Sequence, residues 1–154
     1  PGHICLYESD KKILISGDHI LPTITPNIGL HPQSDENPLG RYIDSLNKMK
    51  QLDAELILPG HESPFTELGA RIDEIICHHE QRNREILTLI KDEAQTAYRI
   101  AREIPWAEGV GWQGLPLFHQ RMAIFETLAH LELMIANQQI EKFSRDSIIY
   151  YRQT

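Results

Sequence analysis

The stretch Lys12-Ile13-Leu14-Ile15-Ser16-Gly17-Asp18 (KILISGD) decides how the rest of the chain is interpreted. Its apolar residues are continuous and rich in β-branched side chains, with charge before them and Gly17-Asp18 after them, which is typical of a buried strand. A second run of the same kind, Glu55-Leu56-Ile57-Leu58, ends in Pro59-Gly60-His61. The sequence therefore predicts two buried strands, each followed by a glycine and then by a polar side chain.

A helix is predicted between these two strands. Asn37 is typical of a helix N-cap, and Pro38 suits the first helical position. Apolar residues then recur at helical spacing: Leu39, Tyr42, Ile43, Leu46 and Met49. Strand, helix and strand in this order form a βαβ unit, whose two strands lie parallel in one sheet. We therefore expect an α/β fold for the first part of the chain.

From residue 66 the pattern becomes mainly helical. We expect a long helix to about residue 91, a shorter one from Thr96 to Ile104, and a third that opens at Pro116. The apolar stripe expected on the third helix comprises Leu117, Ile124, Leu128, Leu131 and Ile135. Two apolar runs, 140–143 and 148–151, then predict a hairpin. Three helices followed by a hairpin is the order of elements in a winged helix, so we place a domain boundary near residue 68, between domains 1–68 and 69–154.

Asp18 and His61 are the candidate site residues. Each follows a buried strand, and because the strands are expected to be parallel, both side chains should emerge at the same edge of the sheet, where open α/β sheets bind ligands. A carboxylate and an imidazole suit a divalent ion such as zinc. From spacing alone a second interpretation stays open, because Gly-Asp after a strand is also typical of a turn and a single histidine is often structural.

The residues around this pair resemble the C-terminal half of the metallo-β-lactamase superfamily, and in particular its glyoxalase-II-like hydrolases with an appended winged helix. The resemblance lies in Pro1–Tyr7, Leu14–Asp18 with Ile20-Leu21-Pro22, Leu58–His61, and His78, Arg82, Ile86 and Leu87. It implies the C-terminal half of an αββα sandwich followed by a winged helix. It also implies that Asp18 bridges two zinc ions, as the catalytic carboxylate, and that His61 completes the second ion's ligand set.

His3 invites a metal-binding interpretation that the resemblance does not support. It precedes Asp18 by fifteen residues, which matches the family's second, non-ligand histidine, so we expect a buried strand histidine with a satisfied hydrogen bond. The family's His-x-His-x-Asp-His cluster is absent from these 154 residues. Because a catalytic zinc normally takes three protein ligands and a water, two ligands are too few. We therefore expect the C-terminal portion of a longer protein and no activity from this portion alone.

The intact protein is expected to use zinc-activated hydroxide on a small-molecule acyl substrate, namely a thioester, ester or lactone. The alternative is a winged-helix protein that binds nucleic acid, or an endoribonuclease of the same superfamily. The net charge of −7 argues against strong nucleic-acid binding. A third interpretation is a folded interaction unit whose incomplete sheet favours a homodimer.

No apolar run approaches the roughly 18 residues of a spanning helix, so we expect no membrane segment and a cytoplasmic location. His78 and His79 are neighbours on a helix and are expected to be solvated or at an interface. Two roles stay open for His19 beside Asp18 and for His31 in the following loop: support of the site, or a position on the surface. Trp106 is expected to be a packing anchor.

Overall fold

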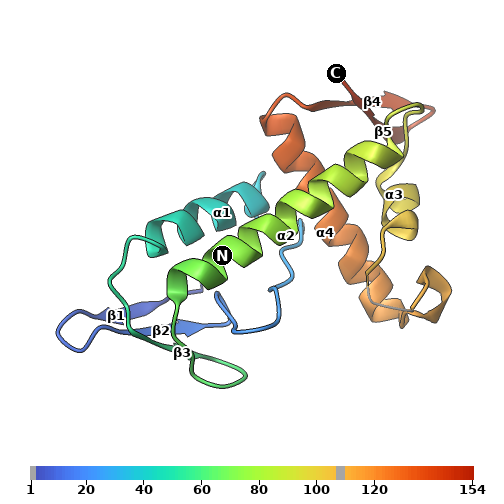
Figure 1. Ribbon diagram of the computed structural model, residues 1–154. Coiled ribbons are helices and arrows are strands. Elements are labelled where there is room, and N and C mark those ends of the chain that lie inside the picture. The colour runs from blue at the N-terminus through green and yellow to red at the C-terminus, as the bar shows by residue number, and fades with distance from the viewer. Residues whose placement is uncertain (1–2, 107–109) are drawn as a thin grey trace. The chain divides into compact units, whose positions relative to one another are not determined.

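The computed structural model describes residues 3–106 and 110–154. Pro1 and Gly2, which belong to the stretch that carries the resemblance, lie outside the described residues, as does Gly109. The predicted strands, helices and hairpin appear in the expected order, together with a short first strand and a 3-10 turn (Figure 1). They are β1 (Leu6–Glu8), β2 (Ile13–Gly17), α1 (Pro38–Met49), β3 (Leu56–Pro59), α2 (Leu68–Leu89), α3 (Ala97–Glu103), the 3-10 turn Trp112–Gly114, α4 (Leu117–Ala136), β4 (Ile140–Arg145) and β5 (Ile148–Gln153).

The chain divides into two compact units. Unit 1 comprises residues 3–26 and 41–78, and unit 2 comprises 27–40, 79–106 and 110–154. Both α1 and α2 contribute to both units, since the division falls within each helix. The domain boundary near residue 68 stays a prediction. Among the described residues, no helix combines the length and the apolar composition that crossing a membrane requires.

Unit 1 contains a three-stranded sheet in the order β1-β2-β3. Strand β2 pairs antiparallel with β1 and parallel with β3, and Ile13 lies opposite Leu56 while Ile15 lies opposite Leu58. The parallel pairing predicted from the βαβ pattern is thus confirmed. The N-cap is confirmed as well, because the Asn37 side chain accepts a hydrogen bond from the Gly40 amide at 3.0 Å.

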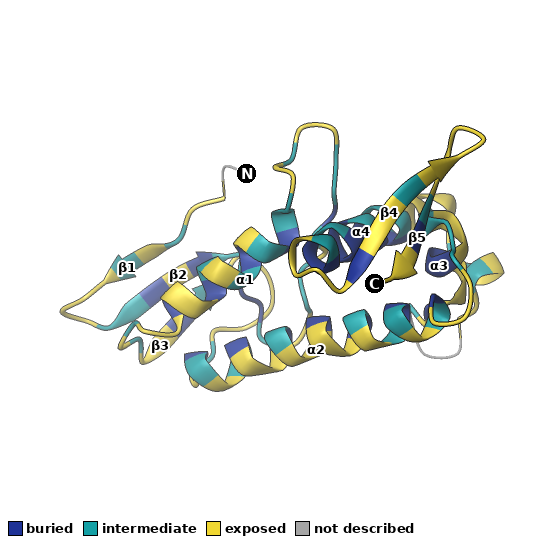
Figure 2. Cartoon of the chain, turned by 90° about the horizontal axis from the view of Figure 1, so that it is seen from above, coloured by how far each residue is buried: buried dark blue, intermediate teal, exposed yellow. Residues whose placement is uncertain are grey.

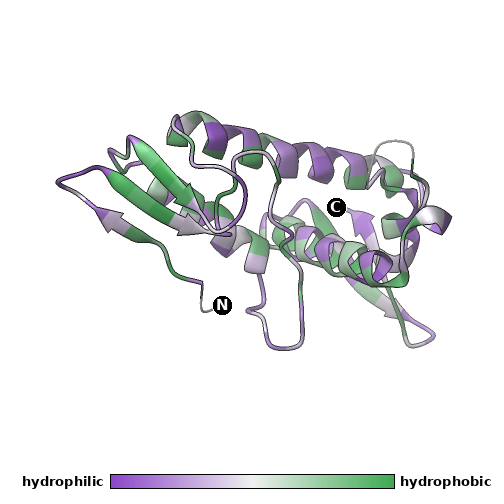
Figure 3. Cartoon of the chain, turned by 90° about the horizontal axis from the view of Figure 1, so that it is seen from below, coloured by the Kyte–Doolittle hydropathy of each residue, from purple (hydrophilic) through white to green (hydrophobic). Residues whose placement is uncertain are grey.

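One face of this sheet is buried and the other is open. Leu14 and Ile57 point into the core of unit 1, which they share with apolar residues of α1, of the loop after β2 and of the first half of α2: Ile20, Leu21, Tyr42, Leu46, Met49, Leu68, Ile72 and Ile75. Because side chains alternate along a strand, the neighbours Leu6 and Ile15 project from the opposite face. They are 58% and 48% exposed, and Figure 3 shows β2 and β3 largely in the hydrophobic colour.

Unit 2 packs three helical segments and a hairpin around an apolar core. The core comprises Ile86, Ile90, Ile100, Ile104, Leu131, Met134, Ile140 and Tyr151. Figure 2 shows that α2 is buried along one side and exposed along the other, as its amphipathic pattern predicts. Trp106 packs against this core and donates its indole N–H to the Ala101 carbonyl, so its role as a packing anchor is confirmed.

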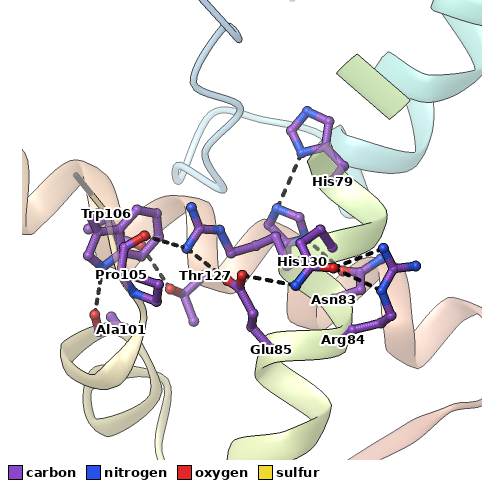
Figure 4. Close-up of polar contacts among 12 residues, drawn as sticks. His79, Asn83, Arg84, Glu85, Ala101, Pro105, Trp106, Thr127 and His130 are labelled. Carbon is purple, nitrogen blue, oxygen red and sulfur yellow. Dashed lines mark hydrogen bonds and ion pairs between the residues drawn. The ribbon is translucent and has the colours of Figure 1, made fainter. Parts of the chain in front are cut away.

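A polar network lies inside unit 2 (Figure 4). His79 Nδ1 lies 3.3 Å from His130 Nε2, and His130 Nδ1 lies 2.6 Å from Asn83 Oδ1. Arg82 places its guanidinium 4.5 Å from the Trp106 ring centre and donates to the Pro105 carbonyl. Buried polar groups are expensive unless they are hydrogen-bonded, so these bonds offset part of the cost of burying them. Arg82 Nε is buried without a hydrogen-bond partner among the described residues.

Two helical predictions were wrong here. His79 is buried rather than solvated. Leu117, predicted in the apolar stripe of α4, is 81% exposed, whereas the buried side of that helix carries Glu126, Thr127 and His130. Three other residues of the predicted stripe lie as expected, because Leu131 is buried and Leu128 and Ile135 pack against the core. Hydropathy does not place the buried polar residues, because it treats them as exposed, whereas here they are hydrogen-bonded inside unit 2.

Candidate functional site

Asp18 and His61 lie side by side where two parallel strands end. The Asp18 Oδ1 atom is 2.5 Å from His61 Nδ1, and the two side chains are 51% and 72% exposed. Asp18 follows directly on β2, and His61 comes two residues after β3. The structure thus brings together the two residues that the strand pattern singles out, and leaves both accessible to a ligand. Their role as metal ligands stays a prediction.

A β-bulge aims the Asp18 side chain. The register between β2 and β3 shifts between Ile15 and Gly17, and Gly17 has φ +52, a conformation that glycine adopts without steric cost. Such bulges re-aim the side chains that follow them. Beyond the bulge, the Gly60 amide donates to the Gly17 carbonyl at 2.9 Å, which joins the two strand ends at the site.

Buried Ser16 anchors the start of the loop that follows Asp18. Its hydroxyl donates to the Ile20 carbonyl at 2.9 Å, and its own carbonyl accepts from the His19 amide at 3.1 Å. A fully buried serine inside an apolar strand carries no clear sequence signal. The turn around Asp18 makes it necessary, because the buried Ile20 carbonyl would otherwise lack this donor.

Gly60 leaves space for the Asp18 carboxylate. A Cβ atom on Gly60 would lie 2.7 Å from Asp18 Oδ1 and 3.3 Å from the Gly17 carbonyl carbon. Any side chain there would therefore displace the carboxylate. Gly60, although next to His61 in the sequence, thus determines where the Asp18 carboxylate lies.

The turn that carries His61 closes back onto the sheet. Ile57 and Phe65 exchange two backbone hydrogen bonds, of 2.8 and 3.1 Å, in an antiparallel bridge. Residues 58–64 are therefore held at both ends, which limits how far His61 can move from Asp18.

His3, His31 and His19 are the other histidines that precede His61 in the chain. His3 does make a hydrogen-bond contact, with its Nε2 3.2 Å from the Ser16 carbonyl. It is nevertheless exposed and precedes β1, so the prediction of a buried strand histidine was wrong. His31 lies in unit 2, where its ring meets Phe125 edge to face at 4.5 Å.

His19 is held by α1. Its Nε2 lies 2.9 Å from the Ser45 hydroxyl, and its carbonyl accepts from the Tyr42 hydroxyl at 2.8 Å. Burial lowers the pKa of this imidazole, and the neighbouring His3 lowers it further, so neutral pH favours the uncharged ring. From the sequence, Tyr42 was noted only as an apolar position of the helix and Ser45 was not noted, because a position on the inner face of α1 is the only signal either residue carries.

The donor set fits part of a zinc site. Zinc binds carboxylate oxygen and imidazole nitrogen, and this pair presents both, next to a glycine that leaves room for the carboxylate. Residues 3–106 and 110–154 contain no group of three or more His, Cys, Asp or Glu side chains placed to hold a metal. Asp18 and His61 are thus compatible with two positions of a larger ligand set.

Comparison with known proteins shows which family the first part of the chain is similar to. Residues 1–61 match the family model of the Metallo-beta-lactamase superfamily. The chain is 22% identical to Probable metallo-hydrolase YqjP of Bacillus subtilis (strain 168), over 98% of this chain and 46% of that protein. It is 32% identical to Lactamase-like protein nscB of Arthroderma benhamiae, over 82% of this chain and 26% of that protein.

The fold is similar to that of solved members of the superfamily. A metallo-beta-lactamase family protein from Thermus thermophilus has a TM-score of 0.82 and 28% identity, covering 100% of this chain and 47% of the other. A Beta-lactamase domain protein from Burkholderia ambifaria has a TM-score of 0.84 and 28% identity, covering 97% of this chain and 44% of the other. The chain therefore spans less than half the length of the relatives it matches. The structural similarity extends across both units of this chain.

Proposed function

We propose that the protein containing this chain is a zinc-dependent hydrolase of thioesters, esters or lactones, in the glyoxalase-II-like branch with a C-terminal winged helix. The observation that carries the proposal is the contact between Asp18 Oδ1 and His61 Nδ1 at the ends of two parallel strands. The names of the relatives, a metallo-hydrolase and lactamase-like proteins, support a hydrolase. The three-helix and hairpin order of unit 2 supports the winged-helix assignment.

The chain's own residues would act as follows. Asp18 would hold metal through its carboxylate and would orient the attacking water, and His61 would supply one imidazole nitrogen as a further ligand. Zinc, when bound, lowers the pKa of that water towards neutrality and polarises the substrate carbonyl. The bulge at Gly17 and the space at Gly60 keep the carboxylate in place before substrate arrives, and such preorganisation favours catalysis.

Substitution in the whole, zinc-loaded protein tests this proposal. Removing a group that only supports a ligand typically costs 10–100-fold, so Asp18→Asn and His61→Gln should each lower thioester hydrolysis by at least about 100-fold. Asp92→Asn and His119→Gln are matched controls at exposed positions and should leave the rate unchanged. Hydrolysis that survives both site substitutions would refute the assignment, and the 154-residue chain alone should show no turnover.

A second candidate function is nucleic-acid binding by the hairpin. Phe143 and Tyr150 stack across β4 and β5 with ring centres 5.9 Å apart, and Arg145 and Arg152 lie over the two rings. Aromatic rings with arginines suit stacked bases. Arg152 is, however, neutralised by Glu141 at 2.5 Å. Affinity for single-stranded RNA that falls steeply with salt would favour this candidate, and no binding at low salt would exclude it.

We also propose that the isolated chain forms a homodimer through its sheet. Leu6, Ile15 and Leu56 project from one face of the sheet and are 58%, 48% and 37% exposed. Exposed apolar patches of this kind favour association. Sedimentation of the chain should show a dimer that Ile15→Lys disrupts; a strict monomer at high concentration would exclude it.

A further inference from the structure

Glu62, the residue after His61, makes three hydrogen bonds to the loop that follows Asp18. Its carboxylate accepts from the Thr23 amide at 3.2 Å, from the Ile24 amide at 3.4 Å and from the Thr23 hydroxyl. One side chain thus connects the His61 turn to the Asp18 loop.

Arg71, on α2, holds the same loop through its carbonyl groups. Its Nε donates to the Leu21 carbonyl at 2.7 Å and its Nη2 to the Ile24 carbonyl at 3.1 Å, while Nη1 pairs with Glu74. The Arg71 side chain is only 11% exposed. A guanidinium presents its donors in a rigid fork, so Arg71 fixes the spacing of the two carbonyls as well as their position.

Together the two side chains account for four backbone groups of residues 21–24, because Glu62 takes two amides and Arg71 takes two carbonyls. Loop backbone groups that water does not satisfy must find such partners. Residues 21–24 are three to six residues from Asp18, and Leu21 is itself buried. The loop is therefore held at its far end by these bonds and at its near end by Ser16.

The backbone conformation of Glu62 is unusual for a residue with a side chain. Glu62 has φ +68, a conformation that costs a non-glycine residue free energy and that persists where the surroundings determine it. Glycine would adopt it without that cost, but would lack the carboxylate that reaches Thr23 and Ile24. Glu67 also has a positive φ, +63, and is also exposed, yet no side-chain bond to the described residues is seen for it.

We propose that Glu62 and Arg71 are positioning residues that tie the His61 turn to the Asp18 loop and so keep the two groups in contact. The proposal rests on the proposed function only in that it treats Asp18 and His61 as metal ligands. Neither Glu62 nor Arg71 touches the reacting atoms in this scheme. Their effect reaches the site through the backbone of residues 18–24 and of the 58–64 turn.

Amide hydrogen exchange on the 154-residue chain tests the connection without metal. Glu62→Ala removes the acceptor of the Thr23 and Ile24 amides, so both should exchange at least about 5-fold faster, while global stability changes little because the group is exposed. Glu67→Ala alters a glutamate of similar exposure and backbone conformation and should leave both amides unchanged. Glu62→Gln keeps one acceptor oxygen and should restore part of the protection.

Two spectroscopic and binding measurements separate positioning from a merely structural role. Nitrogen-15 chemical shifts of the His61 ring report the contact with Asp18, and they should change in Glu62→Ala and not in Glu67→Ala. Arg71→Lys should change them too, whereas Arg84→Lys, at an exposed arginine of α2, should not. In the whole protein, Glu62→Ala should weaken zinc binding by about 10-fold, a loss of the size that supporting residues cause.

Unchanged exchange at Thr23 and Ile24 together with unchanged His61 shifts in Glu62→Ala would overturn the proposal, as would equal effects from Glu67→Ala. A wild-type protein that binds no zinc would refute the proposed function instead. In that case the exchange and ring-shift measurements still decide whether Glu62 and Arg71 hold the pair together.

Discussion

Gly60→Ala should separate the geometry of the candidate site from the stability of the fold. The added Cβ would lie 2.7 Å from Asp18 Oδ1, where 3.4 Å is the start of ordinary contact. The carboxylate must therefore withdraw by roughly 0.7 Å from its position against the glycine, a shift large enough to disrupt a hydrogen bond. Because Asp18 is half exposed, it can turn towards solvent.

The expected change in the free energy of unfolding is small. An exposed ion pair contributes about 0–1 kcal/mol, which the variant loses. Replacing glycine by alanine restricts the unfolded chain and gains about 0.4–1 kcal/mol where the backbone conformation is compatible. The two terms nearly offset each other, so we expect a net change within about 1 kcal/mol, or about 2–4 °C in Tm for a chain of this size.

The assay combines urea unfolding with the His61 ring shifts. Gly60→Ala should alter the ring shifts while the free energy of unfolding changes by no more than about 1 kcal/mol, and in the whole protein it should lower zinc affinity by about 10–100-fold. Gly69→Ala is the matched control, because a Cβ there meets nothing closer than 4.0 Å. It lies in helix α2 and should stabilise the chain by about 0.5–1 kcal/mol.

Two results would refute the reasoning. A loss of more than about 2 kcal/mol in Gly60→Ala would mean that the backbone near Gly17, 3.3 Å from the added atom, cannot yield. Unchanged His61 shifts would mean that the Asp18 carboxylate does not occupy the space beside Gly60.

Three further predictions concern unit 2. Burial raises the pKa of Glu126 to about 7, so between pH 4.5 and 7 the folded chain keeps a proton that the unfolded chain has released. The free energy of unfolding should therefore fall as the pH rises through this range. Glu126→Gln should remove up to about 3 kcal/mol of this dependence in urea titrations. His130→Ala leaves His79 and Asn83 without one buried partner and should cost about 2–4 kcal/mol by urea unfolding, unlike His119→Ala at an exposed position. Ser147→Gly, at φ +62 in the hairpin turn, should raise Tm through a gain of about 0.5–1 kcal/mol.

The order of elements and several of their ends were predictable from local pattern. The Thr96 cap is one example, since its hydroxyl accepts from the Arg99 amide at 3.3 Å, as the N-cap rule requires. The pairing of Asp18 with His61 was predictable for a different reason: parallel strands end at one edge, and each residue comes within two positions of the end of its strand. In both cases the signal lies in a few adjacent residues.

Long-range polar contacts were not predictable in this way. His79 and His130 are 51 positions apart and meet inside unit 2, and the sequence shows them only as polar residues on helices. Glu62 and Thr23 are 39 positions apart. Their hydrogen bond depends on the positive φ of Glu62, which no sequence motif predicts. Hydrogen bonds between distant side chains depend on exact placement, whereas hydropathy records only an average preference for water.

The sequence by itself determined the α/β order, the parallel pair of strands and the choice of Asp18 and His61, because strand alternation, helix periodicity and capping act over a few residues. Tertiary structure alone decided the fine geometry of the site: the bulge at Gly17, the space at Gly60 and the bonds of Glu62 and Arg71 to one loop. The physical reason is the distance along the chain over which each effect acts. Local patterns act between neighbouring residues, whereas a hydrogen bond between distant segments requires atoms to be placed to within a few tenths of an ångström, which only the packed fold achieves.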